Sequence, residues 1–141
     1  MKRVQKVVAY ITLGDRLLVF TQRDYPDAGV QVPAGTVETG EPIYTAVLRE
    51  AEEETGLKNL KLVKYLGARD FDAAKVLRPD EIHERHFFHL EAANPAPEQW
   101  QHWEMTPSGD DKTPVAFDLK WVEKKRADLF YDFDALLDKI A

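Results

Sequence analysis

The sequence predicts an α/β or α+β fold in which a mixed β-sheet packs between helices. The predicted elements follow the order strands, helix, strands, helix, and the clearest of them is a helix with apolar residues at helical spacing. The 141-residue chain is 44% hydrophobic and 31% charged, which is typical of a folded globular protein. Its length corresponds to one compact domain covering residues 1–141.

The first part of the chain predicts a strand pair. Strands are expected over 4–13 and 16–21, and Gly14-Asp15 between them is typical of a tight turn. A short strand is expected over 30–32, where Pro33 ends it because proline lacks the N–H that a sheet ladder needs.

A helix is predicted over 42–55. Pro42 suits the first turn, where its missing N–H would have no partner. Ile43, Val47 and Ala51 repeat at helical spacing, and Gly56 is a typical left-handed stop.

The second half predicts strands over 60–68, 82–90 and 115–122. Proline, glycine and aspartate recur between residues 92 and 114, which predicts a long loop there. A closing amphipathic helix is expected over 132–140, because apolar residues recur at spacings of three and four: Phe133, Leu136, Leu137 and Ile140.

Composition and charge exclude several classes of protein. The chain has no cysteine, which excludes a disulfide scaffold and a thiolate zinc site. The net charge of −6 disfavours non-specific binding to nucleic acid and to anionic membranes, so a phosphorylated substrate would need local cations. No membrane span or secretory signal is visible, so a cytoplasmic location is expected, and a homodimer is left open.

Three glutamates share one face of the predicted helix. Glu50, Glu53 and Glu54 lie at i, i+3 and i+4, where they repel one another beside the negative end of the helix dipole. A hard divalent cation would reverse the sign of each of these interactions, and clustered carboxylates suit Mg²⁺ or Mn²⁺. The alternative is a solvated acidic face on which Arg49 pairs with Glu53.

The spacing of a longer segment favours the metal interpretation. From residue 35 to residue 57 it resembles the signature box of the Nudix hydrolases. The box is matched by Gly35, five residues, Glu41, seven residues, Arg49-Glu50, two residues, Glu53-Glu54, one residue and Gly56-Leu57. Ala51 departs from the pattern, where a larger aliphatic residue is usual, and we expect it to face the core.

The resemblance implies an α/β/α sandwich that hydrolyses a diphosphate bond linked to another moiety, often a nucleoside. It implies that Glu50, Glu53 and Glu54 bind divalent cations, usually Mg²⁺ with Mn²⁺ as the other candidate. A backbone carbonyl near Ala34 or Gly35 would complete the metal site.

The same resemblance assigns supporting roles to other residues of the box. Arg49 would hold a carboxylate of the box in position. Glu41 would support the site near the start of the helix, and Glu38 lies in a loop from which it could reach the metals through water.

Hydrolysis also needs a carboxylate that removes a proton from the attacking water. Glu50 is the first choice, and Glu53 is a further candidate within the box. Glu98 and Glu104 in the predicted loop are second choices, for which the alternative is that they are simply exposed loop residues.

Aromatic residues are candidates for substrate binding. Trp100 and Trp103 lie in a polar stretch and are expected either to stack on a base or sugar or to fold back as a small satellite core. Tyr25, in the loop before the box, is a similar candidate.

Candidate phosphate contacts lie on two predicted strands or their ends. Gln22 and Arg23 follow the second strand, and Arg85 lies within the strand over 82–90. That strand also holds histidines, which we interpret as strand surface and pocket lining rather than a second metal site: His83, His86 and His89.

The leading functional hypothesis is a metal-dependent pyrophosphohydrolase acting on a small nucleotide-like molecule. An RNA 5′ pyrophosphohydrolase or decapping-type enzyme is an alternative, which the acidic composition disfavours. A non-catalytic module that senses a nucleotide is another, although such a module could lose the box glutamates that this chain retains.

Overall fold

A mixed β-sheet dominates the computed structural model, which describes residues 1–93, 96–105 and 113–140. Its strands are β1 (Lys2–Leu13), β2 (Arg16–Gln22), β3 (Ala34–Thr36), β4 (Lys61–Asp72), β5 (Glu81–Glu91), β6 (Gln99–Glu104) and β7 (Val115–Glu123). The described helices are α1 (Ile43–Thr55) and the short 3₁₀ helices η1 (Pro26–Ala28), η2 (Ala73–Val76), η3 (Lys124–Arg126) and η4 (Leu137–Lys139). The predicted mixed-sheet α+β fold is confirmed.

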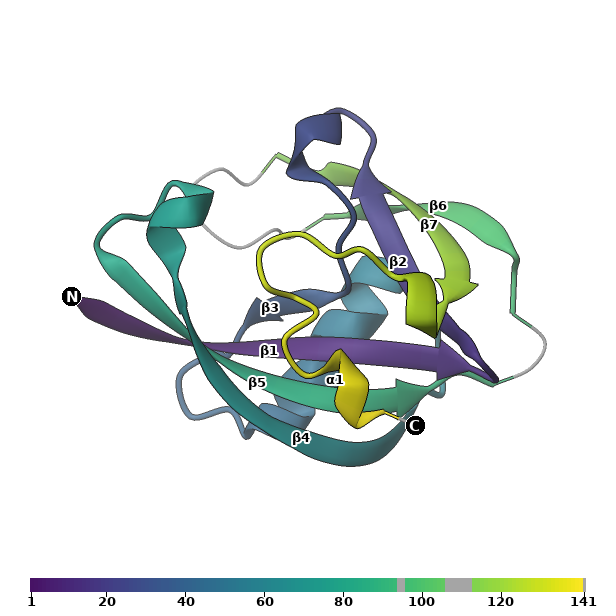
Figure 1. Cartoon of the computed structure of the whole chain (residues 1–141), viewed down its shortest axis with the longest axis horizontal. Coiled ribbons are helices and arrows are strands. Elements are labelled where there is room, and N and C mark those ends of the chain that lie inside the picture. The colour runs from purple at the N-terminus through teal and green to yellow at the C-terminus, as the bar shows by residue number, and fades with distance from the viewer. Residues whose placement is uncertain (94–95, 106–112, 141) are drawn as a thin grey trace.

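Strands β1 and β2 pair only next to the turn that joins them and then diverge. The order of the sheet is β4-β5-β1-β2-β7-β6, with β5 parallel to β1 and β3 attached to the edge of β1 (Figure 1). The edge of β1 is divided, because residues 6–8 pair with β3 whereas residues 12–13 pair with β2. The chain at Gln31, bridged to Phe20 of β2, therefore lies in the gap between the two diverging strands.

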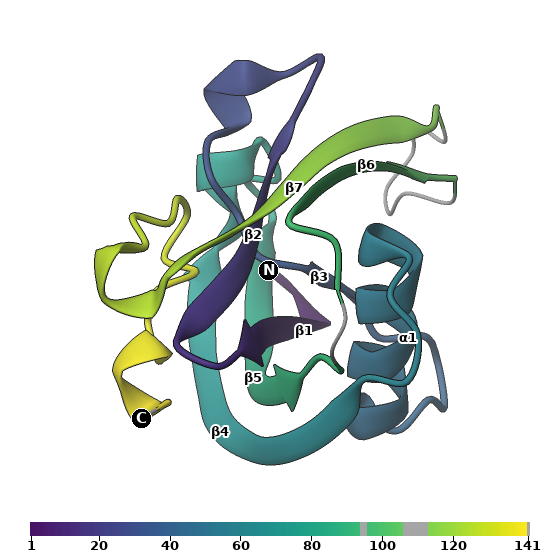
Figure 2. The same ribbon diagram turned by 90° about the vertical axis from the view of Figure 1, so that its right-hand side faces the viewer.

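The two faces of the sheet are covered differently. Figure 2 shows α1 on one side of the sheet and the C-terminal segment on the other. Alternate residues of β1 point to each side. On the helix side the core contains Val7, Ala9, Ile11, Ala46, Val47 and Ala51, and on the other side it contains Val8, Tyr10, Phe133, Leu136 and Ile140.

The predicted helix is confirmed as α1. It begins at Ile43 directly after Pro42 and ends at Thr55, where Gly56 has a φ of 75° and donates its N–H to the Glu52 carbonyl at 2.8 Å. Ala51 is buried and faces the core, as expected. Among the described helices, none is long and apolar enough to cross a membrane.

The helix predicted over 132–140 is wrong. This segment forms successive turns that end in η4. Tyr131 and Asp132, where these turns start, have positive φ angles of 55° and 60°. Its apolar side chains do reach the core, so the spacing correctly indicated burial. A nine-residue segment is shorter than the length at which helices become stable by themselves, and turns bury the same residues.

The prediction of one continuous loop over 92–114 is also wrong. β6 lies within it and pairs antiparallel with β7, while residues 94–95 and 106–112 of the predicted loop lie outside the described residues. The strand expected over 30–32 is reduced to a single bridge at Gln31, and the ladder with β1 begins after Pro33.

Candidate active site

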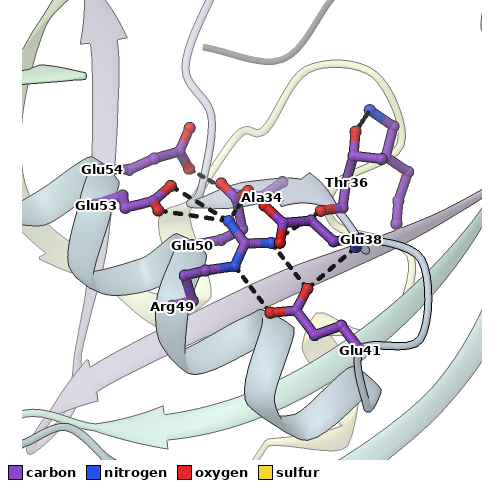
Figure 3. A network of polar contacts seen from close by, with 9 residues as sticks. Ala34, Thr36, Glu38, Glu41, Arg49, Glu50, Glu53 and Glu54 are labelled. Carbon is purple, nitrogen blue, oxygen red and sulfur yellow. Dashed lines mark hydrogen bonds and ion pairs between the residues drawn. The ribbon is translucent and has the colours of Figure 1, made fainter. Parts of the chain in front are cut away.

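Two glutamates of α1 are buried where the helix packs beside β3. Glu50 and Glu54 are only 6% and 7% exposed, whereas the side chain of Glu53 is 35% exposed. All three come from the same side of the last helical turns, as the spacing predicts. The helix therefore places two desolvated carboxylates and one half-exposed carboxylate together (Figure 3).

Arg49 connects the helix to the loop that precedes it. Its guanidinium donates two hydrogen bonds to Glu41, at 2.9 and 3.0 Å, and a third to the Thr36 carbonyl at 3.1 Å. It also donates to Glu50 at 2.9 Å and lies 3.4 Å from a Glu53 oxygen (Figure 3). This pairing lowers the pKa of Glu41 and raises that of Arg49.

Gly35 leaves the space that the Glu50 carboxyl group occupies. A Cβ atom built on Gly35 would lie 2.0 Å from Cδ of Glu50, so no larger residue fits unless that carboxylate moves. The neighbouring Ala34 donates its backbone N–H to Glu54 at 2.7 Å. Strand β3 therefore contacts both buried carboxylates through its backbone.

A third buried carboxylate comes from outside the box. Glu104, at the end of β6, is 5% exposed, and one of its oxygens lies within 4.8 Å of oxygens of Glu50 and Glu54. We call Glu50, Glu54 and Glu104 the acidic cluster. Glu104 is thus a strand residue beside the helix rather than the exposed loop residue of the alternative interpretation.

The position of Glu104 follows from the alternation along β6. Trp100, His102 and Glu104 point to the same side, toward α1. Trp100 donates its indole N–H to the Thr55 carbonyl at 2.8 Å, and Nε2 of His102 lies 2.9 Å from the Glu53 carbonyl. These contacts with the end of the helix hold β6 where Glu104 reaches the helix glutamates.

The acidic cluster resists ionisation when it has no cation. Burial raises the pKa of Glu50 to about 7, against the opposing effect of Arg49. Burial also raises the pKa of Glu54 well above its usual range, and the adjacent Glu104 adds to this. The pKa of Glu104 is raised for the same reason, namely burial.

These residues fit a divalent cation of the hard type. Their donor atoms are all carboxylate oxygens, which Mg²⁺ and Mn²⁺ prefer. Within the described part of the chain, Oε2 of Glu104 is buried without a hydrogen-bond partner, which is costly unless a ligand completes its coordination. Glu53, which the sequence analysis assigned to the metal, lies at the exposed edge of this group, and the ligand role of Gly35 stays a prediction.

A cavity of about 670 Å³ adjoins the acidic cluster. Glu54, Glu104 and Gly35 line it, as do Lys6 and Arg85 from the sheet. Its size is within the range of sites for small organic ligands.

The predicted substrate-binding residues are divided between this cavity and other places. Tyr25, Arg85 and Gln22 line the cavity. Arg23 lies over the ring of Trp103, 5.9 Å from its centroid, and neither residue is part of the cavity wall.

Trp100 takes the position of the satellite-core alternative. It is partly buried against the helix-side core, where its ring lies 6.3 Å from that of Trp121. The substrate-binding role of Trp100, Trp103 and Arg23 stays a prediction.

Two further predicted acids are not members of the acidic cluster. The backbone N–H of Glu38 donates to Glu41, which places Glu38 in the loop held by Arg49. Glu98 is 75% exposed and pairs with Arg16 at 2.7 Å.

Sequence reasoning missed Lys6. This half-buried residue of β1 lines the cavity and donates to Oγ1 of Thr36 at 2.6 Å. Burial lowers its pKa, while Glu50 acts in the opposite direction. The interruption of the apolar pattern of the first strand by a lysine was the one available signal.

Comparison with known protein families yields a match that spans most of the chain. A family model described as the NUDIX domain matches residues 2–135. A segment of 34 residues is 53% identical to the RNA pyrophosphohydrolase of Pelagibacter ubique (strain HTCC1062). This match covers 24% of this chain and only 22% of the length of that curated relative.

Solved structures share the fold. The MutT NUDIX hydrolase from Burkholderia pseudomallei aligns over 100% of both chains with a TM-score of 0.66 and 24% identity. A UDP-X diphosphatase aligns with a TM-score of 0.66 and 16% identity, over 99% of this chain and 63% of that chain. At these identities the similarity establishes the architecture.

Proposed function

Because the chain belongs to the NUDIX domain family, we propose that it is a divalent-metal-dependent pyrophosphohydrolase. The proposed substrate is a small molecule that contains a nucleoside diphosphate unit, such as a nucleoside triphosphate or a nucleotide derivative. The observation that supports this most is the acidic cluster, three buried carboxylates beside a cavity large enough for a nucleotide.

The acidic cluster would hold the cation, with Glu53 at its exposed edge. A divalent cation bound there would offset the negative charge that develops on the phosphate oxygens during hydrolysis. Arg49 acts as a positioning residue, because its bonds to Glu41 and Glu50 join the helix to the preceding loop. Without these bonds the carboxylates would have to be ordered at the moment of binding.

Hydrolysis requires a water oxygen to bond to phosphorus while the bridging P–O bond breaks, and a carboxylate must accept the water proton. We propose that Glu50, which Arg49 orients, accepts this proton. Glu104 is the second candidate, because it lines the cavity with one oxygen that lacks a partner.

The general base can be identified by comparing Glu50→Gln with Glu104→Gln. Because both residues belong to the acidic cluster, loss of the base lowers kcat by an amount that saturating Mg²⁺ or Mn²⁺ does not restore. Loss of a residue that only binds metal weakens Mn²⁺ binding, and added metal restores part of kcat. If Glu50→Gln shows the second pattern and Glu104→Gln the first, the assignment passes to Glu104.

Removal of a 5′ pyrophosphate from RNA is the second candidate function. The short similarity to an RNA pyrophosphohydrolase favours it, although that similarity covers 24% of the chain. The net charge of −6 provides no general attraction to a polynucleotide.

A panel of substrates tests the proposal. Nucleoside triphosphates, dinucleoside polyphosphates, nucleotide sugars, NADH and a 5′-triphosphorylated RNA oligonucleotide are assayed with Mg²⁺, with Mn²⁺ and with EDTA. We expect turnover of a small nucleotide with metal and none with EDTA. Turnover of RNA alone would favour the second candidate, and tight nucleotide binding without any turnover would indicate a sensing module.

The matched control for this panel is Glu52→Gln. Glu52 lies on the same helix but points to solvent, where it pairs with Lys58 at 2.6 Å. It should keep wild-type activity, whereas Glu54→Gln should lose it. Equal activity in the two variants would contradict the metal assignment.

A further inference from the structure

Two cations lie side by side on the sheet wall of the cavity. Lys6 of β1 and Arg85 of β5 are register partners in the parallel ladder between these neighbouring strands (Figure 1). Both residues line the cavity that the acidic cluster adjoins. We call this pair the basic wall.

Aromatic rings fix the guanidinium of Arg85. Its Cζ atom lies 3.7 Å from the centroid of Phe71 and 4.2 Å from that of Phe133. One of its N–H groups donates to the Tyr131 carbonyl. With rings against its faces, the group interacts with a ligand through its N–H edge, which suits the paired oxygens of a phosphate or a carboxylate.

Neither residue of the basic wall is hydrogen-bonded to a carboxylate within the described part of the chain, although Glu50, Glu81 and Glu104 act on Lys6 electrostatically. Among the described residues, no carboxylate forms an ion pair with Arg85, and Asp132, the acid that acts on it electrostatically, is paired with Lys75. Lys6 donates to a neutral threonine hydroxyl. Burial lowers the pKa of Arg85 to about 10 and also lowers that of Lys6.

Burial of adjacent like charges is costly unless an anion compensates them. Glu50 acts on Lys6 electrostatically, so the basic wall begins close to the acidic cluster. A substrate whose diphosphate is held at the acidic cluster would therefore extend a further negative group along Lys6 to Arg85.

We propose that Lys6 and Arg85 form a subsite for an anionic group of the substrate outside the scissile diphosphate. This inference rests on the proposed function and specifies its substrate class. The enzyme prefers nucleotides with a further phosphate over nucleoside diphosphates that are esterified to a neutral group. The further phosphate lies either in the polyphosphate chain or on a sugar.

Three compounds that share adenosine diphosphate distinguish these sources. ATP has a third phosphate in the chain, 2′-phospho-ADP-ribose has one on a sugar, and ADP-ribose has none. We expect kcat/KM to be about tenfold higher for one of the charged compounds than for ADP-ribose, as for a charge-assisted hydrogen bond. Equal values, or a preference for ADP-ribose, would overturn the subsite.

Variants assign the preference to the basic wall. Arg85→Met and Lys6→Met should each raise KM more for the preferred charged compound than for ADP-ribose, and so remove most of the preference. Arg85→Lys should restore part of it. Arg16→Met, which removes an exposed cation paired with Glu98, is the control for lost charge. An equal loss for all three compounds would overturn the proposal.

Arg85 also has a structural contact that the test must separate. Its acceptor Tyr131 begins a turn with two consecutive positive φ angles, so Arg85→Met can loosen this turn. Lys6→Met leaves the turn intact, and thermal unfolding of both variants shows whether a loss is structural. If Arg85→Met loses the preference for the charged compound and Lys6→Met keeps it, the subsite consists of Arg85 alone and the proposed pair is wrong.

Tripolyphosphate separates failure of the subsite from failure of the proposed function. If none of the panel substrates is hydrolysed with either metal, the proposed activity is refuted, but the subsite is not. Calorimetric titration of tripolyphosphate in Mg²⁺ buffer then tests the subsite directly. Affinity about tenfold lower in Arg85→Met than in wild type supports it, and equal affinity overturns it.

Discussion

The acidic cluster adjoins the cavity that the basic wall lines, but the two groups of charges have different partners within the protein. Arg49 bonds to Glu50, and Ala34 donates to Glu54, so part of the acidic cluster is held by partners within the protein. On the basic wall, Arg85 and Lys6 are held by a carbonyl, a hydroxyl and aromatic rings, none of which cancels their charge. This comparison indicates that the acidic cluster binds a cation and that the basic wall binds an anion.

The largest effect expected from this comparison is at Glu54. Glu54→Gln should lower kcat/KM with Mg²⁺ by about 100-fold or more, because a preorganised charge at the reaction centre is lost. The metal-free variant should be at least as stable as wild type, since an ionisable carboxyl group is no longer buried beside Glu104. Steady-state kinetics and thermal unfolding in EDTA measure both, and a lost activity that merely accompanies unfolding would contradict the assignment.

Gly35→Ala tests whether the backbone of β3 defines the acidic cluster. The new methyl group would overlap the Glu50 carboxyl group, so we expect a loss of about 1–3 kcal/mol in unfolding free energy and at least about tenfold in kcat. Gly14→Ala is the control: it has free space but a φ of 63°, so it costs about 1–2 kcal/mol from backbone strain and leaves kcat unchanged. Unchanged activity in Gly35→Ala would show that Glu50 is free to move.

Arg49→Lys tests whether the acidic cluster needs the hydrogen-bond geometry of Arg49 or only its positive charge. Lysine keeps the positive charge but cannot form the paired bonds to Glu41 together with those to Glu50 and Thr36. We expect Mn²⁺ affinity to fall by about tenfold, as for residues that orient metal ligands. Retention of full affinity would mean that charge alone, without the geometry, is sufficient.

The smallest expected effect is on how the folding stability of the metal-free protein depends on pH. The unfolded chain releases the Glu50 proton near its ordinary pKa of 4.5, whereas the folded chain keeps it until about 7. The folded state therefore binds more protons across this interval, and the contribution of Glu50 to stability falls as pH rises from about 4.5 to 7. The lowered pKa values of His83 and His89 act in the opposite direction, so a difference measurement is needed.

That measurement compares the melting temperatures of wild type and Glu50→Gln in EDTA between pH 5 and pH 8. The variant should gain stability relative to wild type as the pH rises, and saturating Mg²⁺ should stabilise wild type more at pH 8 than at pH 5. A difference that does not vary with pH would show that Glu50 ionises normally.

The sequence indicated two members of the acidic cluster, Glu50 and Glu54, because they lie close together in the chain. Glu50 and Glu54 lie one helical turn apart, so the helix alone places them together, and Gly35 and Arg49 belong to the same box. The place of Glu104 depends on the pairing of β6 with β7 and on the packing of Trp100 against α1. No local pattern reports such contacts, and the prolines and glycines around β6 favoured a loop.

The basic wall illustrates the same limit more strongly. Arg85 was a candidate from its strand, but its aromatic neighbours come from β4 and from the C-terminal segment that was predicted as a helix. In that segment the apolar spacing reported which side chains are buried and not how the backbone turns. Lys6 acquires its role only through the parallel register with Arg85.

The central claim is that the acidic cluster binds a divalent cation, and direct titration tests it without any substrate. Mn²⁺ binding is measured by electron paramagnetic resonance for wild type, Glu54→Gln and Glu52→Gln at pH 7.5. We expect saturable binding by wild type that is at least about tenfold weaker in Glu54→Gln and unchanged in Glu52→Gln. Equal binding by all three proteins, or no binding by wild type, would contradict it.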